Sequence, residues 1–79
     1  MMRYVLINTE VAKDMGYQTT GHRQTKDGRI LLGEMEIVAH DSDNRRETAF
    51  ATFCTRMDVK PLSDGDISEK LKNKEIIWQ

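Results

Sequence analysis

The side chains best suited to ligand binding gather between positions 17 and 29. This segment combines the densest group of basic side chains in the chain with a nearby aromatic ring: Tyr17, His22, Arg23, Lys26 and Arg29. Basic groups of this kind bind phosphates, and a tyrosine ring can stack on a nucleobase. The same charges also prevent an edge strand from pairing with other molecules. The segment therefore has two interpretations, a binding surface and a solvated hairpin.

The overall charge favours the solvated hairpin. The chain has 79 residues and a formal net charge of -1 at pH 7. A domain that binds nucleic acid is usually basic, because its positive field attracts the phosphate backbone. Nucleic-acid or phosphate binding through residues 17–29 is therefore the alternative hypothesis and not the main one.

The acidic turn after position 40 does not have the pattern of a metal site. His40, Asp41 and Asp43 offer an imidazole and two carboxylates in close succession. In a calcium loop that starts at Asp41, however, Arg46 occupies the glycine position and Thr52 the glutamate position. Two histidines and one cysteine are too few for a zinc site of standard spacing. We expect a hydrated turn and no metal.

Cys54, Glu34 and Glu36 do not indicate catalysis. Cys54 follows Ala51 and Phe53, and apolar surroundings raise the pKa of a thiol and make it inert. On a half-buried strand, Glu34 and Glu36 would share the outer, solvated face. The chain contains no glycine-rich phosphate loop, nucleophilic serine motif or dinucleotide fingerprint. We expect a protein that is not an enzyme and uses no cofactor.

The composition indicates one compact domain over residues 1–79. Hydrophobic residues make up 38% of the chain and charged residues 32%, which is globular but polar for this size. A partner often completes the apolar area of so small a core. The apolar run from Tyr4 to Ile7 is too short for a membrane span or a secretion signal, and a single cysteine is atypical of small secreted domains. We expect a cytoplasmic protein without membrane contact.

The apolar-rich stretch of residues 29–40 is the predicted centre of the fold. From position 34 onward its residues alternate in the period of a strand with one buried face. The apolar residues Ile30 and Leu32 occupy even positions, whereas the apolar face after position 34 uses odd positions. Gly33 lies where this alternation shifts by one residue, which predicts a β-bulge. A helical stripe is the rival interpretation, formed by Leu31, Met35 and Val38. Gly33 inside the stretch favours a strand that runs from Ile30 to Ala39.

A strand and a short helix are predicted at the start of the chain. Residues 3–8 contain a β-branched and aromatic run without a helix or strand breaker. Residues 9–15 follow as a helix, with Thr9 as its N-cap and Gly16 in the left-handed position after its end.

A hairpin is predicted to connect this helix to the central strand. Residues 17–25 are polar and predict an exposed edge strand or a loop. Asp27 and Gly28 then predict a two-residue type I′ turn, which needs positive φ at both positions. This turn would pair the polar arm with the central strand.

The segment of residues 44–57 has two interpretations. Its apolar residues follow a helical spacing: Ala49, Phe50, Phe53, Cys54 and Met57. Asn44 and Glu47 have the spacing of a capping box, which also favours a helix. Several threonines, and two arginines at the start, oppose a helix, so a return strand stays open.

The last part of the chain predicts a helix and a short strand. Ser63 is the predicted N-cap of a helix over residues 63–72, because Asp64 and Asp66 follow it at the positive end of the dipole. Asn73 is a fitting end. Residues 76–78 are too apolar for a free tail and predict a short terminal strand.

These elements together predict an α+β domain in the order strand, helix, strand and strand, then a helix or return strand, a helix and a terminal strand. The main functional hypothesis is a small non-enzymatic interaction or accessory module. It would bind a protein partner or a second copy of itself through an exposed hairpin or strand edge.

Overall fold

The computed structural model describes residues 2–40 and 46–79, and this part contains two strands and four helices. In chain order they are β1 (Tyr4–Asn8), α1 (Thr9–Asp14), β2 (Arg29–Gly33), α2 (Glu34–His40), α3 (Arg46–Met57) and α4 (Asp64–Lys72). The predicted α+β class is confirmed. The predicted order of strand, helix, strand and strand is not, because β1 and β2 are the only strands among the described residues.

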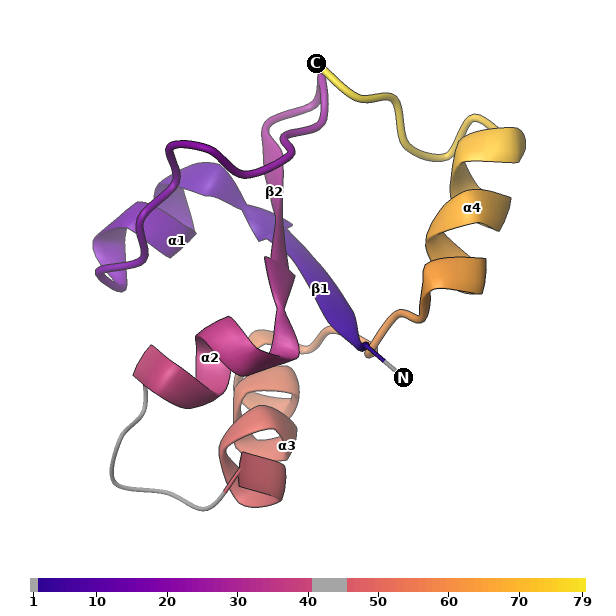
Figure 1. Ribbon diagram of the computed structural model, residues 1–79. Coiled ribbons are helices and arrows are strands. Elements are labelled where there is room, and N and C mark those ends of the chain that lie inside the picture. Colours follow the sequence, from indigo (N-terminus) through magenta and orange to yellow (C-terminus); the bar gives the residue numbers. More distant parts are fainter. Residues whose placement is uncertain (1, 41–45) are drawn as a thin grey trace.

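β1 and β2 pair antiparallel and divide their side chains between two faces. The register places Val5 opposite Leu32 and Leu6 opposite Leu31. Neighbours along a strand point to opposite faces, so Val5 and Leu32 share one face while Leu6 and Leu31 share the other. In Figure 1, α4 lies on one side of the sheet and α1 on the other.

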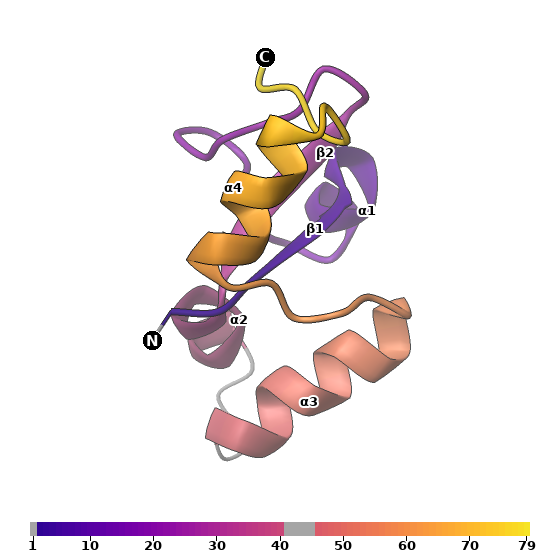
Figure 2. The ribbon, with the colours of Figure 1, turned by 90° about the vertical axis from the view of Figure 1, so that its right-hand side faces the viewer.

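Each face of the sheet has its own hydrophobic core, and the two cores are unequal. The larger core joins the sheet to α1, α2 and α3, and its buried residues are Val5, Ile7, Ala12, Tyr17, Ile30, Leu32, Ile37, Phe50, Phe53 and Cys54. The smaller core lies under α4, where the buried residues are Leu6, Ile67 and Ile76. Figure 2 shows α4 lying in front of both strands. Because stabilisation follows the apolar area buried, α4 is held less strongly than the other helices.

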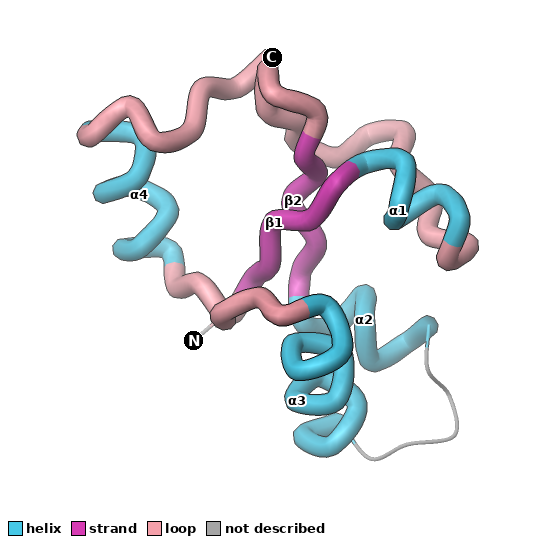
Figure 3. The backbone as a smooth tube through the Cα atoms, turned by 180° about the vertical axis from the view of Figure 1, so that it is seen from behind, coloured by secondary structure: helices cyan, strands magenta, loops and turns pink. Residues whose placement is uncertain are grey.

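Isolated bridges extend the sheet on both sides. The bridged pairs are Tyr4–Leu62, Gln24–Ile30 and Thr25–Trp78. The residues just before α4 thus lie along the β1 margin of the sheet. The C-terminal residues lie along the β2 margin, where Figure 3 shows the C-terminal end next to the loop that precedes β2. The predicted terminal strand at 76–78 is confirmed only as this one bridge. Residues 17–25 form a loop that pairs at its last two residues, and residues 77–79 occupy the outer edge that we expected to be exposed.

Residues 34–40 form helix α2, so the predicted strand over Ile30–Ala39 is wrong in its second half. The change of parity at Gly33 marks the junction of strand and helix, not a β-bulge. α2 buries Ile37 and leaves Met35 49% exposed, which does not fit a strand with one buried face. The glutamates of its first turn interact favourably with the helix dipole, whereas we had assigned them to the outer face of a strand.

An ion pair fixes the start of α2. The backbone N–H of Glu34 donates to the carbonyl of Arg3 at 2.9 Å, and the Glu34 carboxylate pairs with the Arg3 guanidinium. Glu34 is 3% exposed. The same guanidinium lies 4.6 Å from the ring centroid of Phe50 in α3. The first residues of the chain therefore connect α2 to α3.

The hairpin turn lies where we predicted it, but its type differs. The N–H of Thr25 donates to the carbonyl of Arg29 at 2.8 Å, and the N–H of Gly28 donates to the carbonyl of Thr25 at 3.1 Å. Gly28 has a φ of 88°, while Asp27 is not among the residues with positive φ. A loop of this length that ends in a left-handed glycine is a common hairpin connection. The two-residue type I′ prediction is therefore wrong.

Three helices end in the same way. Gly16 after α1, Asp58 after α3 and Lys74 after α4 all have positive φ. The N–H of each donates to the carbonyl three positions earlier, as in a Schellman motif. The left-handed position of Gly16 is confirmed. The N-cap of α1 is Asn8 and not the predicted Thr9.

Both helices predicted in the second half of the chain are confirmed. Residues 46–57 are helical, so the alternative of a return strand is wrong. Asn44 of the predicted capping box and the acidic turn of residues 41–44 lie outside the described residues. α4 begins after Ser63, which exchanges hydrogen bonds with Asp66 in a capping box. Its C-cap is Asn73, as predicted.

The adjacent leucines of β2 test the division into two unequal cores. Leu32 is fully buried in the larger core, so Leu32→Ala should lower the free energy of unfolding by about 3 kcal/mol. Leu31 packs half-buried against the smaller core, and Leu31→Ala should cost about 1 kcal/mol. Urea unfolding monitored by circular dichroism measures both values. Equal losses would contradict the division.

Candidate binding groove

A cavity of about 540 Å³ lies between α4, the sheet and the loop before the hairpin. Its apolar side chains come from the start of the chain, β1, β2, α4 and the C-terminal end, and they are Met2, Tyr4, Leu31, Ile67 and Trp78. Its charged or titratable side chains are His22, Arg23, Glu36 and Asp64, and we call them the rim. We call this cavity the α4 groove. Its lining combines apolar side chains with a few polar groups, as ligand sites do.

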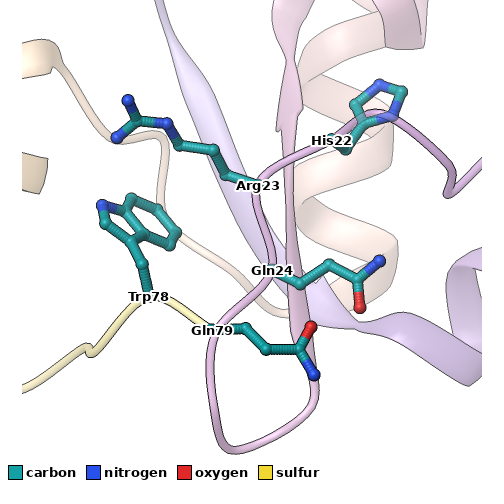
Figure 4. A pocket seen from close by; sticks show the side chains of 5 residues that line it. All are labelled: His22, Arg23, Gln24, Trp78 and Gln79. Carbon is teal, nitrogen blue, oxygen red and sulfur yellow. The ribbon is translucent and has the colours of Figure 1, made fainter.

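A second hollow of about 330 Å³ adjoins the α4 groove. It is lined by His22, Arg23, Gln24, Trp78 and Gln79, so it shares three residues with the groove. Figure 4 shows Arg23 and Trp78 side by side at this hollow, with the two glutamines farther along its wall. The two hollows form one continuous surface around the tryptophan ring.

The groove exists because α4 does not pack closely along the whole sheet. α4 contributes Ile67 to the smaller core, where it meets Leu6 of β1. Farther along the same face, β2 presents Leu31 and then Gly33, where the end of the Met2 side chain lies 3.8 Å from the position that a Cβ would take. The segment before α4 pairs with β1, and the segment after it pairs with the loop residues beside β2. The helix therefore crosses the face of the sheet from one margin to the other, with space beneath it.

The most distinctive contact of the groove joins Arg23 to Trp78. The guanidinium carbon lies 5.4 Å from the ring centroid, which is the geometry of a cation–π interaction. The Trp78 indole N–H is buried and has no hydrogen-bond acceptor among the described residues. Arg23 is exposed and has no carboxylate within ion-pair distance in the same part of the chain. A bound carboxylate would therefore meet a guanidinium that is already oriented.

The acidic groups of the rim already have partners. The Asp64 carboxylate beside the hydroxyl of Tyr4 raises the pKa of Tyr4. The Glu36 carboxylate accepts from Nε2 of His22, whose Nδ1 lies 3.3 Å from the carbonyl of Thr20. These contacts connect β1 to α4 and the loop to α2. Among the charges of the described rim, Arg23 is thus the one available for a ligand.

The hairpin cations do not form the single surface that we predicted. Arg29 binds Asp27, with its Nε 3.1 Å from each carboxylate oxygen and its Nη2 2.9 Å from one of them. This hydrogen bond and a second from Thr25 lower the pKa of Asp27. Lys26 lies exposed in the same turn. Arg29 and Lys26 are therefore separate from the α4 groove.

Tyr17 belongs to the core and not to a binding surface. It is 8% exposed, and its ring centroid lies 4.1 Å from that of His40 and 6.0 Å from that of Phe53. The ring is therefore not available to stack on a nucleobase. Of the five predicted site residues, the structure brings His22 and Arg23 together at the groove and places the other three elsewhere.

Sequence reasoning missed the aromatic side of the groove. We predicted that residues 76–78 would contact the rest of the domain, but nothing in the sequence showed that Trp78 would lie against Arg23. Asp64 was recognised only as a residue of the helix start. The one available signal was the burial expected of an apolar segment that ends in tryptophan.

The remaining chemistry of the described residues is modest. Cys54 is 8% exposed, and burial raises the pKa of its thiol, as its apolar neighbours predicted. Within residues 2–40 and 46–79, no group of three or more histidine, cysteine, aspartate or glutamate side chains could hold a metal ion. No helix in these two ranges has the length and apolar character needed to cross a membrane.

Comparisons with models of protein families, with curated proteins and with solved structures found no match for this chain. The functional argument therefore rests on the residues themselves.

The Arg29 contact predicts the titration of Asp27. A carboxyl group with a lowered pKa in the folded state contributes stability above its unfolded pKa, and this stability is lost as the pH falls through the lower folded value. In Arg29→Gln the Asp27 pKa should rise toward its ordinary value of 3.8, because the largest contributor is removed. Carbon-detected NMR titration of the Asp27 carboxyl group measures this change. An unchanged pKa would show that Arg29 does not hold the carboxylate.

Proposed function

We propose that the protein is a small non-enzymatic interaction module that binds a segment of a partner protein in the α4 groove. The observation that carries this proposal is the oriented Arg23 guanidinium over Trp78, in a cavity of about 540 Å³ that both residues line. Interface energy concentrates in tryptophan, tyrosine and arginine side chains that surround such pockets, and all three types are present here.

The groove favours an extended segment with one apolar side chain and one acidic side chain. The apolar side chain would cover Leu31, Ile67 and the ring of Trp78. The carboxylate would pair with Arg23, which has no carboxylate within ion-pair distance among the described residues, whereas Glu36 already pairs with His22. A charge-assisted hydrogen bond at a partly desolvated site contributes both affinity and orientation.

The same geometry gives less support to our earlier hypotheses. A strand added to the hairpin edge would compete with residues 77–79, because Lys26 and Gln24 already bond to Ile77 and Gln79. Nucleic-acid or phosphate binding through residues 17–29 would need these cations and Tyr17 on one surface, but Arg29 and Lys26 lie apart from His22 and Arg23, and Tyr17 is buried. Protein interaction through the groove is therefore the function that these contacts favour.

Peptide selection tests the proposal. Random linear dodecapeptides displayed on phage are selected on the wild-type protein and depleted on Arg23→Glu. Enriched sequences should share an acidic residue close to an apolar residue and bind with a Kd on the order of 10 μM. Binding should change the fluorescence of Trp78, the single tryptophan of the chain.

A matched charge reversal provides the control. Arg23→Glu should weaken the selected peptides about tenfold or more, because it removes the guanidinium and adds a repelling charge. Lys26→Glu changes the net charge equally at an exposed position outside the groove and should alter the Kd by less than about twofold. Equal weakening by both variants would contradict a groove site. Groove signals that shift on dilution of the protein alone would instead identify a second copy as the partner.

A further inference from the structure

We propose a second ligand site, an oxyanion pocket at the other margin of α4. A hollow of about 170 Å³ there is lined by three cationic residues, Arg29, Lys60 and Lys70. Its remaining lining is apolar and consists of Leu6, Val59 and Leu62. No acidic residue lines it. This site is separate from the α4 groove and does not depend on the function proposed above.

The three cations come from separate parts of the chain. Arg29 is the first residue of β2 and pairs with Asn8, which places it on the face that α4 covers. Lys60 lies in the segment between α3 and α4, and Lys70 lies in the last turns of α4. Their positions in the sequence, far apart, gave no indication that they line one pocket.

The charges at this pocket are incompletely balanced. Asp27 takes up the Nε and Nη2 side of the Arg29 guanidinium and fixes its orientation. Glu75 lies 3.9 Å from the Lys70 ammonium, at the limit of an ion pair. Lys60 has no carboxylate within ion-pair distance in the described part of the chain. Arg29 and Lys70 each have one carboxylate partner, so Lys60 supplies the unbalanced positive charge of this pocket, and the apolar walls strengthen its potential.

The edge of β1 adds a backbone donor to the pocket. Tyr4 and Leu62 exchange two hydrogen bonds of 2.8 Å, and the alternation of an antiparallel strand directs the N–H of Leu6 to the same side. The next pair along this margin would be Leu6 with Lys60, and no bridge joins these two residues. The N–H of Leu6 therefore faces the hollow where a continued strand would have met it.

The chemistry of the pocket selects a tetrahedral oxyanion. A phosphate monoester or inorganic phosphate offers three acceptor oxygens and up to two negative charges, which match donors that arrive from three directions. A carboxylate offers two oxygens in one plane and one charge. The ligand class is therefore phosphate, either free or carried on a phosphorylated side chain.

NMR titration with inorganic phosphate tests the site. Sodium phosphate is added to the ¹⁵N-labelled protein at constant ionic strength, with sodium chloride as the compensating salt. The amide signals of Leu6 and Lys60 should shift and saturate with a Kd on the order of 1 mM. A phosphoserine tripeptide forms the second arm. Tighter binding of the tripeptide identifies a phosphorylated protein as the source, and tighter binding of inorganic phosphate identifies the free anion.

A matched pair of double variants separates a site from general charge attraction. Lys60→Gln/Lys70→Gln should weaken phosphate binding about tenfold or more. Lys26→Gln/Lys72→Gln removes the same charge from exposed positions outside the pocket and should change the Kd by less than about twofold. Lys60→Gln alone, in an exposed loop, repeats the test if the double variant unfolds. Shifts that do not saturate, or equal weakening in both double variants, would overturn the proposal.

Discussion

The antiparallel pairing of β1 with β2 determines where the other described elements pack. Successive side chains of each strand point to opposite faces, so the sheet has two apolar faces, and each must be covered by helices. Residues of α1, α2 and α3 close over the face of Val5 and Leu32, whereas α4 and the segments on either side of it cover the face of Leu6 and Leu31. This unequal cover leaves space under α4, and both hollows that we assign to ligands open along the margins of that helix.

Local signals in the sequence predicted the elements whose ends are set by one or two residues. Ser63 with Asp66 defined the start of α4, and Gly16 defined the end of α1. The stretch around Gly33 was different, because its apolar residues fit both a strand and a helix. What distinguishes them is the ion pair of Glu34 with Arg3, whose guanidinium lies over Phe50; these contacts join distant segments and do not follow from periodicity.

The candidate site was predictable only in part for the same reason. The sequence marked His22 and Arg23 as basic side chains on a loop, and both line the groove. It could not show that Trp78 would supply the aromatic surface in place of Tyr17, since the bridge between Thr25 and Trp78 joins segments far apart in the chain. The pairing of Arg29 with Asp27 also orients this cation in the hairpin turn, apart from the groove.

The self-contained termini of α4 give the helix a degree of independence. Its capping box and its Schellman end satisfy terminal backbone groups without help from the sheet, and Ile67 is its one buried side chain. Such a helix can detach while the strands stay paired, as a separate cooperative unit. Its backbone amides would then exchange with deuterium through an opening that costs less than global unfolding. The depth of the groove would be an average over closed and open forms, which would allow it to accept side chains of different size.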